Sequence, residues 1–272
     1  MRAPVTRKQL CAEGLLKQAR RVFSTLEDKP GCEIPLVDHL MAGLALFGLK
    51  YPSLLQFDRD GRDATTAANL RALYGIERAP SDTGFRERLD QIDPRQLRPL
   101  YKSLLGLLQR GKGLEGFDWL DGHYVLSLDG TGYYSSQKVH CAQCGEKHHR
   151  NGTVTYYHQM LGAVLVNPDC REVIALAPEP ILKQDGAKKN DCERNAAKRL
   201  LEDLRREHPH LKLLVVEDAL ASNAPHIRQL KSLNLRFILG AKQSDHGFLF
   251  DWVEQTAQTA TLELTDAKGV HH

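Results

Sequence analysis

The sequence lacks several features that would each place it in a broad class of protein. It has no apolar run long enough to span a membrane, and Met1 to Pro4 do not begin a secretory signal. Its six cysteines are mostly isolated along 272 residues, which is not the spacing of a disulfide-bonded scaffold. We therefore expect a cytoplasmic protein with reduced thiols and no membrane partner.

The sequence also lacks a P-loop, a dinucleotide-binding fingerprint, an internal repeat and a low-complexity segment. These absences exclude the common nucleotide-driven enzymes. The net charge of +3 neither requires nor excludes a polyanionic partner. Basic residues nevertheless cluster over 183–189, 194–206 and 228–242, which predicts a locally positive face.

The first part of the chain is predicted to be helical. From Gln9 to Gln109, apolar residues recur at helical spacing, and the residues over 80–83 can cap a helix that ends near Pro94. A further amphipathic helix is expected over 95–110, and a glycine-containing linker follows near 111–116. We interpret residues 1–115 as a helical N-terminal domain.

The character of the sequence changes at Tyr124, where strands and turns begin. Residues 120–272 are therefore interpreted as a second domain. The predicted strands cover 124–129, 153–166, 172–176, 211–217 and 236–239, and the predicted helices cover 191–207 and 225–233. The first long helix carries an apolar face and has Asp191 as its expected cap. The predicted order is three strands, a helix, a strand, a helix and a strand. This order matches a ribonuclease H-like fold, so we expect an α/β fold with a mixed-sheet core.

Two acidic residues stand at the predicted ends of buried strands. Asp129 ends the strand that begins at Tyr124 and precedes a glycine-flanked turn, and Asp218 ends another strand about 90 residues later. Sheets of this class place their chemistry at the carboxyl ends of strands. Two such carboxylates can share divalent metal ions, as phosphoryl-transfer chemistry requires. The alternative is that each aspartate caps the turn or helix that follows.

Four short motifs in the same order resemble the acid-triad (Asp-Asp-Glu) transposases of bacterial insertion sequences. They are Leu128-Asp-Gly-Thr-Gly132, Tyr156-Tyr-His-Gln159, Asn190-Asp-Cys-Glu-Arg-Asn195 and Glu217-Asp-Ala-Leu220. The resemblance implies strand cleavage and transfer on double-stranded DNA with Mg²⁺ or Mn²⁺, and Asp129 and Asp218 as the first two catalytic acids. It also implies that the N-terminal domain binds DNA ends or supports assembly, and that a homodimer holds two ends together.

The third acid of that family is a glutamate on a helix beyond the fifth strand, and the sequence departs from the pattern there. Glu254 and Glu263 follow the predicted fifth strand, but neither has the family's surrounding residues. The alternation over 261–265 is typical of the start of a β-rich insertion. We therefore expect a C-terminally truncated copy whose activity on its own is in question.

A candidate zinc site lies in the polar segment after the first predicted strand. Cys141 and Cys144 form a C-x-x-C pair, and thiolates with imidazoles suit zinc. His140, His148 and His149 are the expected histidine partners. The alternative is a polar loop without metal. His158 is interpreted as a structural histidine, on the same strand face as Tyr156.

Basic residues near the predicted sheet are candidates for DNA contact. Lys183, Lys188 and Lys189 lie in a loop before the long helix, and Lys242 follows the fifth strand. Ordinary solvent exposure is the alternative for each. Glu193 lies in the first turn of the long helix, and its negative charge is interpreted as interacting favourably with the helix dipole.

Two other functions compete with transposition. Haloacid dehalogenase-like phosphohydrolases use an Asp-x-Asp-Gly-Thr loop, but Ser127 occupies the position of the nucleophilic aspartate here. A non-catalytic DNA-binding remnant or domesticated protein is the other alternative, and its DNA binding would survive the loss of Asp129 or Asp218.

Overall fold

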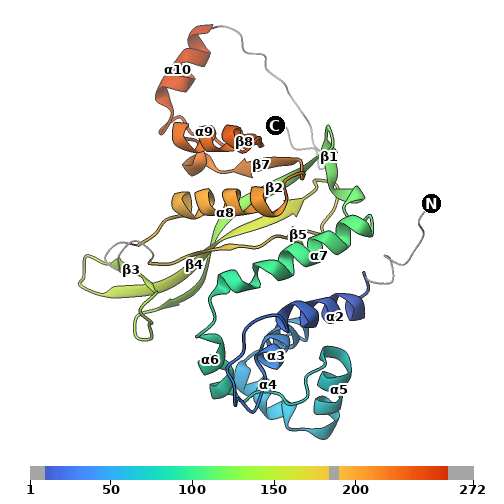
Figure 1. Ribbon diagram of the computed structural model, residues 1–272. Coiled ribbons are helices and arrows are strands. Elements are labelled where there is room, and N and C mark those ends of the chain that lie inside the picture. The colour runs from blue at the N-terminus through green and yellow to red at the C-terminus, as the bar shows by residue number, and fades with distance from the viewer. Residues whose placement is uncertain (1–9, 184–189, 257–272) are drawn as a thin grey trace, which may run out of the picture.

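The structure is a computed structural model that describes residues 10–183 and 190–256 (Figure 1). Lys188, Lys189 and Glu263, named above as candidates, lie outside these residues. Within the described ranges, no helix combines the length and apolar character needed to cross a membrane.

The N-terminal part is helical, as predicted. Its helices are α2 (Ala12–Phe23), α3 (Leu36–Gly48), α4 (Leu54–Gly61), α5 (Ala64–Tyr74), α6 (Asp82–Leu89) and α7 (Arg98–Arg110). Ser81 caps α6 by accepting the Gly84 backbone N–H, which confirms the capping prediction. Pro94 opens a short 3₁₀ turn, so α7 begins three residues later than the expected start at Arg95.

The second part contains one mixed sheet. Its strands are β1 (Asp118–Leu120), β2 (His123–Ser136), β3 (Gly145–His148), β4 (Val154–Val166), β5 (Ile174–Ala175), β6 (Glu179–Ile181), β7 (Leu213–Glu217) and β8 (Arg236–Leu239). The main order is β3-β4-β2-β7-β8, with β1 on β2 and β5 and β6 on β4. Strand β2 pairs antiparallel with β4 and parallel with β7, and β7 pairs parallel with β8. The α/β class with a mixed sheet is therefore confirmed.

Strand β2 is longer than predicted, and the expected turn after Asp129 is wrong. The strand continues through Gly130 and Gly132 to Ser136 because β4 pairs with it as far as Ser136, with one register irregularity between Gly132 and Tyr134. Only the pairing with β7 ends near the expected boundary, at Ser127. Asp129 thus lies inside a strand, just beyond the end of its parallel partner.

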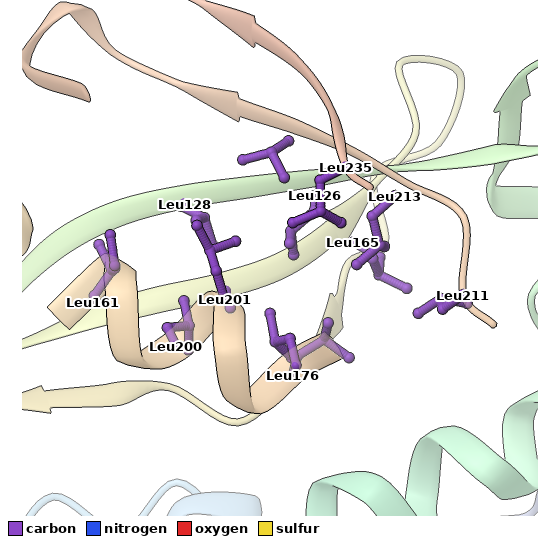
Figure 2. Close-up of a cluster of buried hydrophobic side chains, with 14 of the residues drawn as sticks. Leu126, Leu128, Leu161, Leu165, Leu176, Leu200, Leu201, Leu211, Leu213 and Leu235 are labelled. Carbon is purple, nitrogen blue, oxygen red and sulfur yellow. The ribbon is translucent and has the colours of Figure 1, made fainter. Parts of the chain in front are cut away.

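Helix α8 (Glu193–Glu207) covers one face of the sheet, and its predicted apolar face is buried. Figure 2 shows its leucines pointing into the layer formed by the strand leucines; the labelled residues are Leu126, Leu128, Leu161, Leu165, Leu176, Leu200, Leu201, Leu211, Leu213 and Leu235. The predicted cap is wrong: Asp191 accepts a hydrogen bond from Arg199 Nη2 at 2.6 Å, and α8 begins after Cys192 without a side-chain cap.

Two clusters of buried apolar side chains form the interior, and α7 belongs to both. Leu100 packs in the cluster made by the N-terminal helices, while Leu105 packs in the cluster made mainly by the sheet and α8. In Figure 1, α7 runs between the other N-terminal helices and the sheet.

A buried carboxylate network joins the same two parts. Glu179 of β6 is fully buried and accepts a hydrogen bond from Arg199 of α8 at 2.6 Å. Arg98 of α7 lies 3.9 Å from Glu179 and donates to Glu207 of α8 at 2.7 Å. Charged groups therefore tie α7 to the sheet and to α8 alongside the apolar contacts.

The remaining elements follow the predicted order. Helix α9 (Ala224–Ser232) lies between β7 and β8, as expected from Pro225 near its start. Helix α10 (Gly247–Thr256) follows β8 and has no buried residue. Figure 1 shows α10 standing away from the sheet and α8.

Candidate active site

A cavity of about 260 Å³ opens where β2, the end of β7 and the first turn of α8 meet. Four acidic residues contribute to its lining: Asp129, Glu193, Glu217 and Asp218. Three basic residues line it as well: Arg194, Lys198 and His226. This cavity therefore brings both sequence-predicted aspartates to one place.

Strand register explains why Asp129 and Asp218 meet. Ser127 of β2 is paired with Val216 of β7 in parallel orientation, and each aspartate lies two residues beyond its member of that pair. Equal spacing in parallel neighbours puts the two residues at the same level of the sheet. Both are exposed, so their carboxylates are open to solvent and to a ligand.

Asp218 also caps the turn that follows it, which was the alternative interpretation of this residue. Its Oδ1 accepts the Leu220 backbone N–H at 2.9 Å and caps the 3₁₀ turn Ala219–Ala221. This bond holds the side chain in one orientation beside the cavity. The capping role and a role in the site are therefore compatible.

Glu193 is a third carboxylate of the site, and the sequence analysis assigned it only a helix-dipole role. It lies in the first turn of α8, as predicted, but it also lines the cavity. Burial raises the pKa of its carboxyl group, and the negative charges of Asp129 and Asp218 raise it further. Like charges thus crowd this cavity, which is the electrostatic condition that a bound cation relieves.

Gly130 leaves room for the Glu193 side chain beside strand β2. A Cβ atom at this position would lie 2.0 Å from Glu193 Oε1, so any larger residue would displace the glutamate. At Gly132 the nearest side-chain atom to such a Cβ is 3.9 Å away. The first glycine of the Asp-Gly-Thr-Gly motif therefore makes room for Glu193, whereas a side chain at the second would make only ordinary van der Waals contacts.

Glu217 and His226 form a buried pair at the floor of the same region. The His226 Nε2 atom lies 2.5 Å from Glu217 Oε2, and both side chains are less than a tenth exposed. The sequence predicted Glu217 at the end of a strand and His226 in the helix that follows, but gave no signal that the two side chains would meet.

The carboxylates face the cavity without closing into a tight cluster. Across residues 10–183 and 190–256, the only group of three metal-ligating side chains whose ligand atoms all lie within 4.8 Å is Cys141, Cys144 and His158. Asp129, Asp218 and Glu193 thus stay further apart, and Glu254 of α10 is not among the residues that line their cavity.

The cysteine pair has a different histidine partner from those expected. His158 Nε2 lies 3.4 Å from Cys141 Sγ and 3.3 Å from Cys144 Sγ. His140 instead stacks on Tyr156, with ring centroids 4.1 Å apart. The other two candidates have other contacts: His148 lies 3.3 Å from Glu146, and His149 lies 2.8 Å from the Thr155 hydroxyl.

The remaining predicted site residues differ in whether a ligand could reach them. The Lys183 ammonium is mostly buried and forms an ion pair with Glu146, so it is not presented to a phosphate. Lys242 is exposed after β8. Ser127, the residue at the phosphohydrolase nucleophile position, pairs in mid-sheet and is not among the residues that line the acidic cavity.

Searches against known proteins gave structural similarities only. No family model matches the sequence, and no curated protein matches it. A cryo-EM structure of the piggyBac transposase synaptic complex with hairpin DNA aligns at 12% identity over 96% of this chain, with a TM-score of 0.36. The alignment covers 56% of the piggyBac chain, so this chain spans little more than half of that protein.

Two structures of Mos1 transposase also align. The catalytic domain with raltegravir and Mg shares 13% identity over 63% of this chain and 77% of that chain, with a TM-score of 0.21. The pre-cleavage transpososome shares 14% identity over 96% of this chain and 87% of that chain, also with a TM-score of 0.21. At such identities and TM-scores, function has to be derived from this chain's own residues.

Proposed function

We propose that the chain is a transposase-type polynucleotidyl transferase that cleaves and joins DNA strands at the ends of an insertion sequence with a divalent metal. The observation that carries this proposal is the meeting of Asp129 and Asp218 at one level of adjacent parallel strands, with Glu193 beside them. The ordered sequence motifs around these residues support the same interpretation, and the strand order supports a ribonuclease H-like core.

The donor set fits a hard cation. Carboxylate oxygens are the ligands that Mg²⁺ and Mn²⁺ prefer, and the raised pKa of Glu193 reflects negative charge that a cation would neutralise. Asp129, Asp218 and Glu193 would hold the metal. A metal bound there would activate the attacking hydroxyl and neutralise the leaving oxygen of a phosphodiester.

The chain's own residues would position the DNA. Arg194 and Lys198 are exposed at the cavity and are suited to hold the phosphates on either side of the scissile bond. Lys242 offers a further phosphate contact beyond β8. The helices over residues 1–115 would serve end binding or assembly, and a homodimer would hold two ends together.

Plasmid nicking with Mg²⁺ or Mn²⁺ tests the proposal. Asp129→Asn and Asp218→Asn should each lower the cleavage rate by about 10²- to 10³-fold while leaving DNA binding unchanged, because they remove metal ligands rather than phosphate contacts. Asp169→Asn, in an exposed turn, is the matched control and should cleave normally.

The main alternative is a non-catalytic DNA-binding protein, and the separation of the three carboxylates favours it. That alternative predicts no metal-dependent cleavage by the unaltered chain, and DNA binding that both aspartate variants retain. Cleavage that persists in both variants would refute the proposed role of the acidic cavity.

A further inference from the structure

The Cys141, Cys144 and His158 side chains come together from two separate segments. The cysteines lie in the loop between β2 and β3, and His158 lies on β4. Strand register brings them together, because Tyr134 of β2 is paired with His158 of β4 just before the chain leaves β2 for this loop. The cluster is therefore a product of the fold rather than of sequence proximity.

The distances within the cluster match those of a tetrahedral zinc centre. With Zn–S bonds of about 2.3 Å and Zn–N bonds of about 2.0 Å, tetrahedral geometry separates two sulfurs by about 3.8 Å and sulfur from nitrogen by about 3.5 Å. The two Sγ atoms here are 3.8 Å apart, and the sulfur–nitrogen distances are 3.4 and 3.3 Å. One nitrogen nearly equidistant from two sulfurs is the arrangement expected around a shared central ion.

Neither a disulfide nor a lone hydrogen bond accounts for this cluster. A disulfide would bring the sulfurs to about 2.05 Å, far closer than they are. A single N–H···S hydrogen bond would account for one short distance but not for both. The loop itself is preformed, since the Cys144 backbone N–H donates to the Cys141 carbonyl at 3.2 Å and the Cys141 N–H points at Cys144 Sγ at 3.3 Å.

We propose that Cys141, Cys144 and His158 bind one zinc ion that fastens the β2–β3 loop to strand β4, with a water molecule as the fourth ligand. Cys144 is buried and Cys141 exposed, so the ion has one side open to solvent. The site lies four residues along β4 from Gly162, the partner of Asp129, or about 13 Å away. It is thus separate from the acidic cavity, and its test does not depend on the proposed activity.

Metal analysis of the 272-residue chain tests this proposal. Protein purified with zinc present should retain about one zinc ion per chain, and Cys144→Ser and His158→Asn should each lose it. His140→Asn, His148→Asn and His149→Asn are matched controls, and each should keep the zinc because the structure places those rings in other contacts.

Cobalt provides a second measurement that does not rely on variants folding. Co²⁺ added to the chelator-treated, unaltered chain should give the thiolate charge-transfer and d–d absorption bands of a tetrahedral site. The absence of these bands, zinc content unchanged in His158→Asn, or a Cys141–Cys144 disulfide in protein purified under reducing conditions would each overturn the proposal.

Discussion

Glu193 carries a carboxylate that its surroundings make costly to ionise. Burial and the charges of Asp129 and Asp218 raise its pKa, so the folded protein holds this proton more tightly than the unfolded chain does. The stability of the metal-free protein should therefore fall as the pH rises from the ordinary glutamate range through the raised folded-state value.

Glu193→Gln should remove this loss of stability at higher pH. We expect the variant to have a higher Tm than the unaltered chain at pH 8 without metal, and the difference should shrink as the pH approaches 4, where both side chains are neutral. Added Mg²⁺ should raise the Tm of the unaltered chain more than that of the variant, because the variant offers one ligand fewer. Thermal unfolding with and without Mg²⁺ measures both effects; an identical Mg²⁺ response would remove Glu193 from the proposed site.

Single residues show how far the sequence could predict the sites. Asp129 and Asp218 were recognisable because each follows a short apolar run that is typical of a buried strand. His158 was not recognisable as a partner of the cysteines, because strand register and not sequence distance selects it. His148 and His149 are closer in sequence, yet their rings contact Glu146 and Thr155.

The Glu193 side chain of α8 can lie against strand β2 because position 130 is a glycine. Gly130→Ala should push the Glu193 side chain away, because the added Cβ would overlap its carboxylate. The displaced atoms belong to the end of a flexible side chain, so the stability cost should stay below about 1 kcal/mol. Divalent-metal affinity should fall to the level of Glu193→Gln.

Gly132→Ala is the matched control for this substitution. It adds the same methyl group to the same strand, where the nearest side-chain atom is 3.9 Å away. Calorimetric titration with Mn²⁺ should therefore separate the two variants. Equal metal affinity in both would show that the position of Glu193 does not matter to binding.

The elements themselves were largely predictable, with errors at their ends. The apolar face of α8 and the parallel strands β7 and β8 follow directly from periodicity. The full length of β2 does not, because the residues after Asp129 include two glycines and are polar enough to indicate a turn. Pairing with β4, a tertiary contact, keeps them extended.

At the scale of the whole molecule, Glu179 holds the N-terminal helices, the sheet and α8 together. It is fully buried, and it shares the compensation of the Arg199 and Arg98 charges with Asp191 and Glu207 respectively. Glu179→Gln should lower the free energy of unfolding by about 1 to 3 kcal/mol, since it removes a fully buried countercharge and weakens its hydrogen bond from Arg199, while Glu207 and Asp191 still pair with Arg98 and Arg199. Denaturant unfolding measures this loss.

An exposed ion pair is the control for that prediction. Arg236 and Asp121 lie 3.0 Å apart on the surface, and both side chains are at least half exposed. Asp121→Asn should leave the unfolding midpoint unchanged within error, because solvent screens such pairs. A comparable loss in both variants would mean that burial does not determine the importance of Glu179.

The position of β2 between β4 and β7 has a consequence for the order of folding. Its antiparallel partner β4 follows closely in the chain, whereas β7 is synthesised about 90 residues after β2. Closing the longer loop costs more chain entropy, so the β2–β4 pairing should form first and the β2–β7 pairing late. Asp129 and Asp218 meet only through that late pairing. A partly folded or nascent chain would therefore carry both aspartates without having brought them together, and the cleavage proposed for this chain could not begin before the sheet is complete.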